Sequence, residues 1–247
     1  MDRPLAAAPT GPVTVPPPIL RLAADDDVTP VWRNELGGLT FRLSGPGSVR
    51  YAKWVAAGTP ELDLDAEAER LAWAARHAVV PRVLSRGRDI DGSWLVTTGL
   101  PGRSAVDPVW RDRPDDAARA IGAGLRTLHD ALPVDDCPFT WSAEERISRL
   151  DDADREALGP VPEVDRPVVC HGDACAPNTL VADDATPAGH VDLGTLGVAD
   201  RWADLAVASM SLGWNYVGDH EAALFDAYGV APDQERIAFY RELWELG

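Results

Sequence analysis

A polar segment in the C-terminal half of the chain carries the residue types that phosphoryl transfer needs. It reads H-G-D-A-C-A-P-N at residues 171–178, with Asp173 and Asn178 five positions apart, and V-D-L-G follows at 191–194. Apolar stretches precede both loops, so short strands can hold these polar side chains at one site. Carboxylate and amide oxygens are hard ligands that suit Mg²⁺ beside phosphate oxygens. Asn178 and Asp192 are therefore candidate metal ligands, and Asp173 is left to orient and deprotonate an attacking hydroxyl.

The alternative is that these residues only cap turns, as single aspartates and asparagines in loops usually do. Here three polar residues each follow a predicted strand. The five-residue step from Asp173 to Asn178 is also the step from base to metal-binding asparagine in protein-kinase-type phosphoryl transfer. The sequence therefore predicts an enzyme that moves the terminal phosphoryl group of a nucleoside triphosphate, with Mg²⁺, onto a hydroxyl of a small molecule.

Two histidines and a cysteine have plainer interpretations. His171, two residues before Asp173, is expected to brace the loop with hydrogen bonds rather than to transfer a proton. Cys175 has no base at nucleophile spacing, so packing is its expected role. His129, at the end of a predicted helix, is expected to be an ordinary surface or helix-capping residue.

The elements that must hold this segment follow from the apolar periodicity and from the turn residues. The predicted strands of the first part of the chain cover residues 31–36, 39–43, 49–54, 83–84 and 94–97. A breaker at 100–102 is a natural hinge. The predicted helices cover residues 61–77, 117–132, 200–212 and 237–246. This order predicts an α+β protein with a strand-rich first part and a mainly helical second part. Residues 1–18, rich in Pro and Ala, are expected to be a disordered tail.

Composition narrows the class of protein. Asp and Glu outnumber Lys and Arg, 40 to 23, giving a formal net charge of −17. Such a surface repels nucleic acid and anionic membranes, so neither is an expected partner. Three cysteines, at positions 137, 170 and 175, fit neither a disulfide framework nor a zinc site. No apolar run approaches the roughly 20 residues that cross a bilayer. We expect a cytoplasmic protein, a monomer or a weak dimer.

The catalytic segment also carries a family resemblance. H-G-D-A-C-A-P-N, followed by H-V-D-L-G-T-L-G-V-A-D-R-W-A-D-L-A, closely resembles the aminoglycoside 3′-phosphotransferases. The likeness includes E-A-E-R-L-A-W, W-L-V-T-T-G-L-P-G and R-I-A-F-Y-R-E-L, and runs from about Trp32 to Leu246. It implies a bilobal protein-kinase-like fold, with a small antiparallel-sheet N-lobe carrying one helix at 19–100 and a mainly helical C-lobe at 101–247. It also implies an antibiotic-resistance kinase that uses ATP or GTP.

The resemblance assigns roles at the matching positions. Asp173 looks like the catalytic base, and Asn178 and Asp192 look like the Mg²⁺ ligands. Lys53 matches the strand lysine that holds the α- and β-phosphates, and Glu67 matches its helix partner. Glu69 is a rival partner that the spacing alone does not exclude.

The nucleotide has two further expected contacts. Gly37 and Gly38 lie in the hairpin that would cover the phosphates, where glycine lets the backbone approach closely. They do not form a full G-x-G-x-x-G motif. The base is expected to lie against the linker, with Thr98 and Leu100 as contacts through their backbone groups. ATP and GTP both remain possible because side chains matter little there.

The acceptor end departs from the family pattern. Where the family carries acidic residues for its polycationic substrates, or an Arg after the Asp-x-Gly segment, this chain has the candidate acceptor residues Thr195, Ser211, Trp214, Trp244 and Glu245. We therefore expect weak activity on classical polycationic aminoglycosides. One alternative function is a kinase of another hydroxylated metabolite. The other is a non-catalytic nucleotide-binding protein, which is disfavoured because the key residues of the phosphoryl-transfer site are all present.

Overall fold

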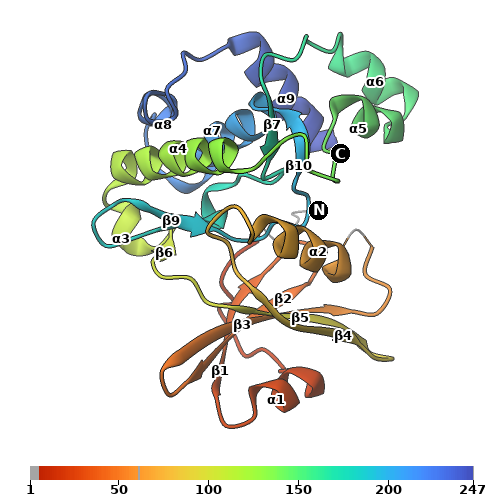
Figure 1. Cartoon of the computed structure of the whole chain (residues 1–247), viewed down its shortest axis with the longest axis vertical. Helices are drawn as coiled ribbons and strands as arrows, with labels where there is room; N and C mark the ends of the chain where they lie inside the picture. The colour runs from red at the N-terminus through yellow and green to blue at the C-terminus, as the bar shows by residue number, and fades with distance from the viewer. Residues whose placement is uncertain (1–5, 61, 247) are drawn as a thin grey trace. The chain divides into compact units, whose positions relative to one another are not determined.

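The computed structural model of the chain describes residues 6–60 and 62–246. It divides into two compact units. Unit 1 comprises Met1–Trp73 and Pro81–Gly99, and unit 2 comprises Ala74–Val80 and Leu100–Gly247. Strands dominate unit 1 and helices dominate unit 2 (Figure 1). This separation is the α+β organisation that the order of predicted elements indicates.

Unit 1 is built on a five-stranded antiparallel sheet with the strand order β1-β2-β3-β5-β4. Its strands are β1 (Asp27–Arg33), β2 (Leu39–Gly45), β3 (Ser48–Ala56), β4 (Val83–Arg88) and β5 (Gly92–Thr98). Alternate residues of β2, namely Leu39, Phe41 and Leu43, are buried. They pack with Ala52 of β3 and Val96 of β5, so one face of the sheet forms the core of this unit.

Two helices accompany this sheet, α1 (Pro17–Ala23) and α2 (Leu64–Ala74). The predicted helix over 61–77 corresponds to α2, and position 61 lies outside the described residues. The sequence analysis missed α1, whose Ile19 is fully buried in the core of this unit. In the segment predicted to be a disordered tail, Ala7 also exchanges two backbone hydrogen bonds with Arg33. Residues 1–5 lie outside the described part of the chain.

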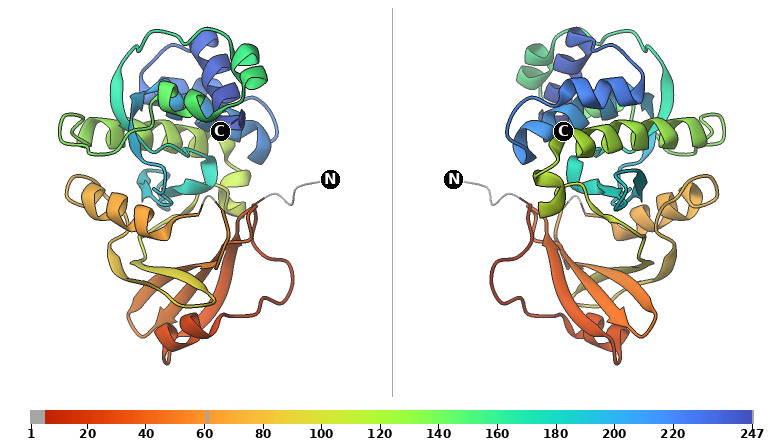
Figure 2. Two further views of the ribbon diagram at one scale, coloured as in Figure 1. Left: turned by 90° about the vertical axis from the view of Figure 1, so that its right-hand side faces the viewer. Right: turned by 90° about the vertical axis from the view of Figure 1, so that its left-hand side faces the viewer.

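Unit 2 is mainly helical. Its helices are α3 (Pro108–Arg111), α4 (Pro114–Ala131), α5 (Ala143–Arg149), α6 (Asp152–Leu158), α7 (Trp202–Asn215), α8 (Glu221–Tyr228) and α9 (Gln234–Leu246). The long helix α4 packs against α8, and α7 packs against α9 (Figure 2). The sequence analysis missed α5 and α6, which begin at the side-chain caps Ser142 and Asp151.

Short strands in unit 2 position the polar loops. β7 (Pro167–Cys170) pairs with β10 (Gly197–Asp200), and β8 (Thr179–Val181) lies between β6 (Arg103–Ser104) and β9 (Pro187–His190). β7 ends one residue before His171. The 3₁₀ turn η1 (Ala176–Asn178) leads directly into β8, and β9 ends two residues before Asp192. The candidate residues therefore follow or precede strand ends, as the sequence predicts.

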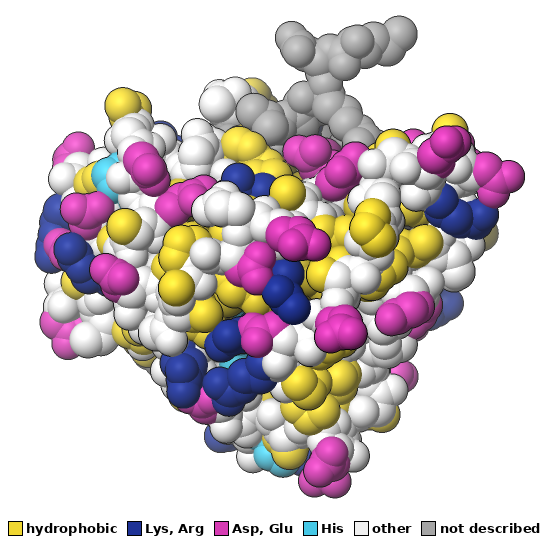
Figure 3. Space-filling model, turned by 90° about the horizontal axis from the view of Figure 1, so that it is seen from above, with side chains coloured by type: hydrophobic (Ala, Val, Ile, Leu, Met, Phe, Trp, Pro, Cys, Tyr) yellow, Lys and Arg dark blue, Asp and Glu magenta, His cyan; other side chains and the backbone are white. Residues whose placement is uncertain are grey.

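The surface carries its charge in a mixed pattern. On the face drawn in Figure 3, acidic, basic and hydrophobic side chains are interspersed, so the net charge of −17 is not gathered into one acidic patch there. Within the described residues, every helix is too short or too polar to span a bilayer.

Candidate active site

The loop from His171 to Asn178, hereafter the catalytic loop, depends on a glycine at its second position. Gly172 has φ +85°, a conformation that residues with a side chain rarely adopt. A Cβ atom there would overlap the carbonyl oxygen of Thr195 and the ring of Trp141. The Trp141 indole Nε1–H also donates a 3.0 Å hydrogen bond to the Gly172 carbonyl. The backbone just before Asp173 is thus fixed from two sides.

His171 braces the catalytic loop, as predicted. Its fully buried ring accepts a 3.3 Å hydrogen bond from the Asp173 backbone N–H at Nδ1. Its Nε2 lies 2.9 Å from the carbonyl oxygen of Val191. Because Nδ1 accepts and a carbonyl can only accept, the proton must lie on Nε2, which donates to Val191. One neutral imidazole therefore ties Asp173 to the residue before Asp192.

Asp204 on α7 anchors the start of the loop. One carboxylate oxygen accepts hydrogen bonds from the His171 backbone N–H at 2.6 Å and from His129 Nε2 at 2.9 Å. The other accepts from the Gly172 N–H at 2.9 Å. Burial alone would raise the pKa of Asp204, but the hydrogen bonds from His129 and from the loop backbone outweigh burial and lower it. The carboxylate thus stays ionised inside unit 2.

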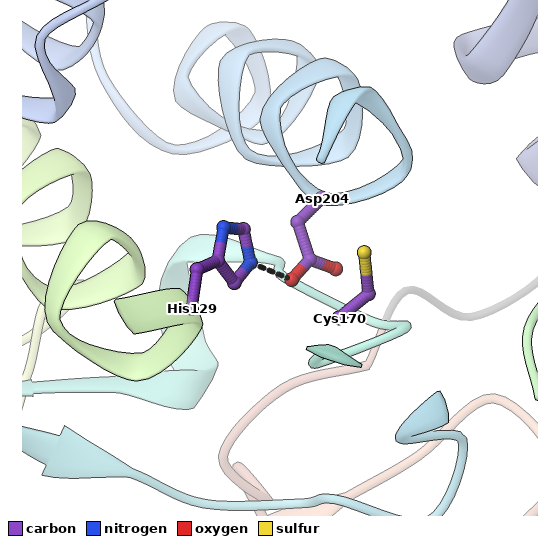
Figure 4. A group of neighbouring side chains, drawn as sticks. All are labelled: His129, Cys170 and Asp204. Carbon is purple, nitrogen blue, oxygen red and sulfur yellow. Dashed lines mark hydrogen bonds and ion pairs between the residues drawn. The ribbon is translucent and has the colours of Figure 1, made fainter. Parts of the chain in front are cut away.

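His129 corrects the sequence analysis. It is not a surface or capping residue, because its side chain is fully buried between Asp204 and the Tyr228 hydroxyl, 2.9 Å from each. Figure 4 shows His129 of α4, Asp204 of α7 and Cys170 of β7 as one group, with ligand atoms close enough for a metal ion. Each of these atoms already has a protein partner; the Cys170 thiol donates to the Asp200 carbonyl. The group is therefore a satisfied hydrogen-bond network.

Asp173 combines burial with an open hydrogen-bonding position. The Asn178 amide Nδ2 donates to the Asp173 backbone oxygen at 2.9 Å and to its Oδ2 at 3.1 Å. Its Oδ1 is buried and has no partner among residues 6–60 and 62–246. Burial raises the pKa of Asp173, and the negative charge of Asp192 raises it further. A buried carboxylate oxygen without a partner marks the position of a missing hydrogen-bond donor, such as a substrate hydroxyl.

Asp192 lies beside Asn178 because their strands pair. Thr179 of β8 opposes His190 of β9, and the Val191 backbone N–H donates to the Asn178 carbonyl at 3.0 Å. Asp192 has φ +64°, a strained conformation for a residue with a side chain and one that tends to persist at functional sites. The Asn178 amide nitrogen faces Asp173, which leaves its Oδ1 for a cation. An amide oxygen next to a carboxylate is the donor set that Mg²⁺ takes.

Unit 1 holds the predicted lysine–glutamate pair. The Lys53 ammonium lies 2.7 Å and 2.9 Å from the two carboxylate oxygens of Glu67. Glu67 is buried, whereas the Glu69 side chain is 64% exposed and lies near Arg86. The phase of α2 therefore turns Glu67 toward β3 and excludes Glu69, an alternative that spacing alone left open.

The glycine hairpin of unit 1 is a tight turn. Asn34 closes it, because its Oδ1 accepts the Gly38 N–H at 2.6 Å and its backbone N–H donates to the Gly38 carbonyl. Gly37 has φ +89°. A Cβ on Gly38 would lie 2.8 Å from the Asn34 amide nitrogen, so the side chain of Asn34 requires a glycine there.

The linker residues differ in what they can offer a ligand. The Thr98 N–H and hydroxyl both bond to the backbone of Arg82, and the Gly99 N–H bonds to Val49. For Leu100, no backbone hydrogen bond is found within the described chain. Leu100 is therefore a linker position whose backbone groups are left without a backbone hydrogen bond in the described chain.

The sequence matches a known protein family. The family model of the phosphotransferase enzyme family matches residues 34–240. The chain belongs to this family. The matched range contains the Lys53–Glu67 pair, the catalytic loop and Asp192.

Similar members of this phosphotransferase family are aminoglycoside 3′-phosphotransferases. That of Streptomyces ribosidificus is 38% identical over 243 residues, which cover 85% of this chain and 91% of the relative. That of Streptomyces fradiae is 35% identical over 247 residues, with the same coverage of 85% and 91%. An aminoglycoside phosphotransferase of Streptomyces rimosus, solved with ADP and streptomycin, has 30% identity and a TM-score of 0.70, covering 91% of this chain and 94% of that one.

These likenesses confirm the predicted family and the bilobal protein-kinase-like fold. They also confirm that the chain is a phosphotransferase with an alcohol group as acceptor. The roles of its individual residues and the identity of its acceptor belong to the proposals below.

Four of the five candidate acceptor residues of this phosphotransferase are at least partly accessible, and the fifth, Ser211, is buried. Trp214 of α7 and Trp244 of α9 form an aromatic pair with ring centroids 5.7 Å apart, and Trp214 is 52% exposed. Thr195 and Glu245 are also exposed. Ser211 does not fit the acceptor role, because it is fully buried and its hydroxyl accepts a 2.8 Å hydrogen bond from the Ala176 N–H. It supports the catalytic loop instead.

Proposed function

We propose that this phosphotransferase transfers the γ-phosphoryl group of ATP to the 3′ hydroxyl of an aminoglycoside, with Asp173 as the catalytic base. The observation that carries the proposal is the buried Asp173 Oδ1, which has no partner in the described residues. It lies in a loop that His171 and Asp204 hold rigidly. The named activity of the two Streptomyces relatives supports the 3′ position.

Asp173 is the group that would receive the acceptor hydroxyl. Its Oδ2 is held by Asn178, so the carboxylate cannot rotate freely and Oδ1 keeps a fixed direction. A hydroxyl bound at Oδ1 would be oriented for in-line attack on the γ-phosphorus. It would lose its proton to the carboxylate as the new O–P bond forms and the bond from that phosphorus to the departing ADP breaks. The raised pKa of Asp173 makes it a stronger base than an ordinary aspartate.

Asn178 Oδ1 and the Asp192 carboxylate would hold Mg²⁺, which fits the hard oxygen donors present. Held by these two residues, Mg²⁺ would supply positive charge that offsets the charge developing on the phosphate oxygens during transfer. The strained backbone of Asp192 supports this role, because such strain needs a reason to persist.

Unit 1 would supply the nucleotide contacts. Lys53, kept in place by Glu67, is a donor for the α- and β-phosphates, and the Gly37–Gly38 turn offers backbone close to them. Leu100 would bond the base edge, which both ATP and GTP present. The ADP bound to the S. rimosus relative favours ATP. Residues 19–100 would then be the nucleotide-binding lobe and 101–247 the catalytic and acceptor lobe.

A second acceptor class is favoured by the Trp214–Trp244 pair. Indole faces bind a cation with about 0.5–2 kcal/mol, much less than several charge-assisted hydrogen bonds together. A less cationic hydroxylated metabolite with an apolar or aromatic face would suit this pair better. If the acceptor belongs to this second class, the enzyme should phosphorylate kanamycin and neomycin inefficiently. Their kcat/KM should then lie below about 10⁵ M⁻¹s⁻¹, the range that efficient enzymes reach.

The test is a kinase assay with Mg²⁺ and ATP or GTP against aminoglycosides, simple sugars and amino alcohols. Phosphorus NMR of the product identifies the hydroxyl that carries the phosphate. A phosphorylated aminoglycoside supports the proposal, and efficient turnover of a non-aminoglycoside alone favours the second class. Failure to phosphorylate any acceptor by an enzyme that binds nucleotide would contradict both.

A further inference from the structure

Arg146 on α5 has no role in the function proposed above, yet it lies close to the catalytic loop. Its guanidinium carbon sits 4.3 Å from the centre of the Trp141 ring, a cation–π stacking distance. Trp141 is almost fully buried, and its indole N–H bonds to the Gly172 carbonyl, one residue before Asp173. A single aromatic ring therefore links the guanidinium to the backbone that carries the catalytic base.

In the part of the chain that the structure describes, the guanidinium of Arg146 has no carboxylate within ion-pair distance, and its buried Nε has no hydrogen-bond partner. Arg149, one turn later on the same helix, is exposed and pairs with Glu145. Burial lowers the pKa of Arg146, and Arg149 lowers it further, while the charges of Glu145 and Asp173 oppose that change.

Buried donors without partners are rare in folded proteins, and a ligand is one common reason for them. The guanidinium offers five N–H donors in a fixed plane, and stacking on Trp141 limits the orientations that this plane can take. It also places a positive charge on the ring that bonds to the residue before Asp173. The guanidinium can donate hydrogen bonds to an oxygen atom of a ligand, whereas its positive charge repels an ammonium group.

We propose that Arg146 is a specificity-determining residue of the acceptor site: it donates hydrogen bonds to an oxygen of the acceptor next to the reacting hydroxyl and excludes an ammonium group there. The inference rests on the proposed function, since it needs an acceptor hydroxyl at Asp173. It explains why a half-buried cation persists unpaired beside a catalytic loop. A site built to bond a hydroxyl discriminates strongly against an analogue that cannot make that bond.

Kanamycin A and kanamycin B test the inference, because they differ only in a hydroxyl or an amino group at the carbon beside the 3′ hydroxyl. The wild-type enzyme should prefer kanamycin A in kcat/KM by about 10-fold or more. Arg146→Gln should raise KM for kanamycin A about 10- to 100-fold and leave kanamycin B nearly unchanged, so that the preference is lost. Arg149→Gln, on the same helix and exposed, is the matched control and should behave as wild type.

Hydrolysis of ATP by water in the absence of acceptor separates acceptor binding from phosphoryl chemistry. Arg146→Gln should hydrolyse ATP at the wild-type rate, which also shows that the variant is folded. A lower hydrolysis rate would assign Arg146 to the transferring phosphoryl group and overturn the inference. So would an unchanged ratio of kcat/KM between the two kanamycins. If the wild-type enzyme phosphorylates neither kanamycin, the proposed function fails and the inference fails with it. If it phosphorylates both and Arg146→Gln leaves the ratio of their kcat/KM values unchanged, only the inference fails.

Discussion

The catalytic loop and the Trp214–Trp244 region lie in the same helical unit but are built differently. Backbone N–H groups of the loop are held by the His171 ring and by Asp204. Among the described residues its Asp173 Oδ1 is buried and has no hydrogen-bond partner, so we expect it to face the acceptor. Trp214 stands half exposed at the end of α7 and has an aromatic contact with Trp244 near the end of α9. Phosphoryl transfer demands fixed groups at fixed spacing, whereas acceptor recognition can change at helix ends without disturbing the fold.

The largest expected effect tests whether the loop is as specialised as its geometry suggests. Asp173→Asn keeps the shape of the side chain but removes the base, so kcat should fall about 10²- to 10⁴-fold. Nucleotide affinity in the presence of Mg²⁺ should stay near wild type, because in the proposed role Asp173 contacts the acceptor and not the metal. Calorimetry with a non-hydrolysable ATP analogue measures this affinity. A loss of binding as large as the loss of turnover would assign Asp173 to the metal site instead.

Asp204 tests the rigid support of the loop. Asp204→Ala leaves His129 and two backbone N–H groups of the loop without their buried acceptor. Each buried donor left without a partner costs about 1–3 kcal/mol, so the free energy of unfolding should fall by about 3–5 kcal/mol in total. Urea denaturation followed by circular dichroism measures the change. The exposed Glu242→Ala is the control and should stay within about 0.5 kcal/mol of wild type. An equally small change for Asp204→Ala would contradict the anchoring role.

The pH dependence of this anchor has a definite sign. The pKa of Asp204 is lower in the folded chain than its ordinary value, so its stabilising contribution is complete above about pH 4. It is lost as pH falls through the folded-state pKa, where the carboxylate takes up a proton. Asp204→Asn lacks this contribution at every pH. The difference in stability between wild type and this variant should therefore stay constant from pH 7 to about pH 4 and shrink as pH falls further. A difference that does not shrink below pH 4 would contradict the assignment.

Asp192 tests the metal half of the same site. Asp192→Ala should weaken the binding of Mg²⁺–nucleotide by about 10- to 100-fold, because the carboxylate would join the ion to the protein. Binding measured with EDTA in place of Mg²⁺ should be similarly weak in wild type and variant. If the variant binds Mg²⁺–nucleotide as well as wild type does, the strained loop at 191–194 is structural only.

Residues 171–178 and Asp192 could be singled out because short strands and a fixed five-residue step indicate a chemistry. The structure brings them to neighbouring strand ends, and their roles stay predictions. Glu67 and Glu69 could not be separated until the phase of α2 showed which one faces β3. Ser211 and His129 were misassigned because their burial comes from helices far away in the sequence.

Short helices were the other weak point, for a physical reason. α5 and α6 have only seven residues each, mostly polar, so they show little apolar periodicity. Their start signals, Ser142 and Asp151 as N-caps followed by acidic residues, were present in the sequence. Arg146 could not have been singled out from sequence, since its unpaired state and its stacking on Trp141 appear only in the fold.

The smallest expected effect concerns the acceptor side. Trp214→Ala removes an exposed ring that can stack on a sugar or attract an ammonium group, a contact of about 0.5–2 kcal/mol. KM for the acceptor should therefore rise about 2- to 30-fold, with the KM for ATP unchanged. Val217→Ala, at an almost fully exposed residue just beyond the same helix, is the matched control. The size of the effect distinguishes acceptors as well: a less cationic acceptor that relies on stacking should suffer more than kanamycin. Equal KM values for wild type and Trp214→Ala with every acceptor would mean that recognition lies elsewhere, and the contrast between a fixed loop and an adaptable aromatic region would not hold.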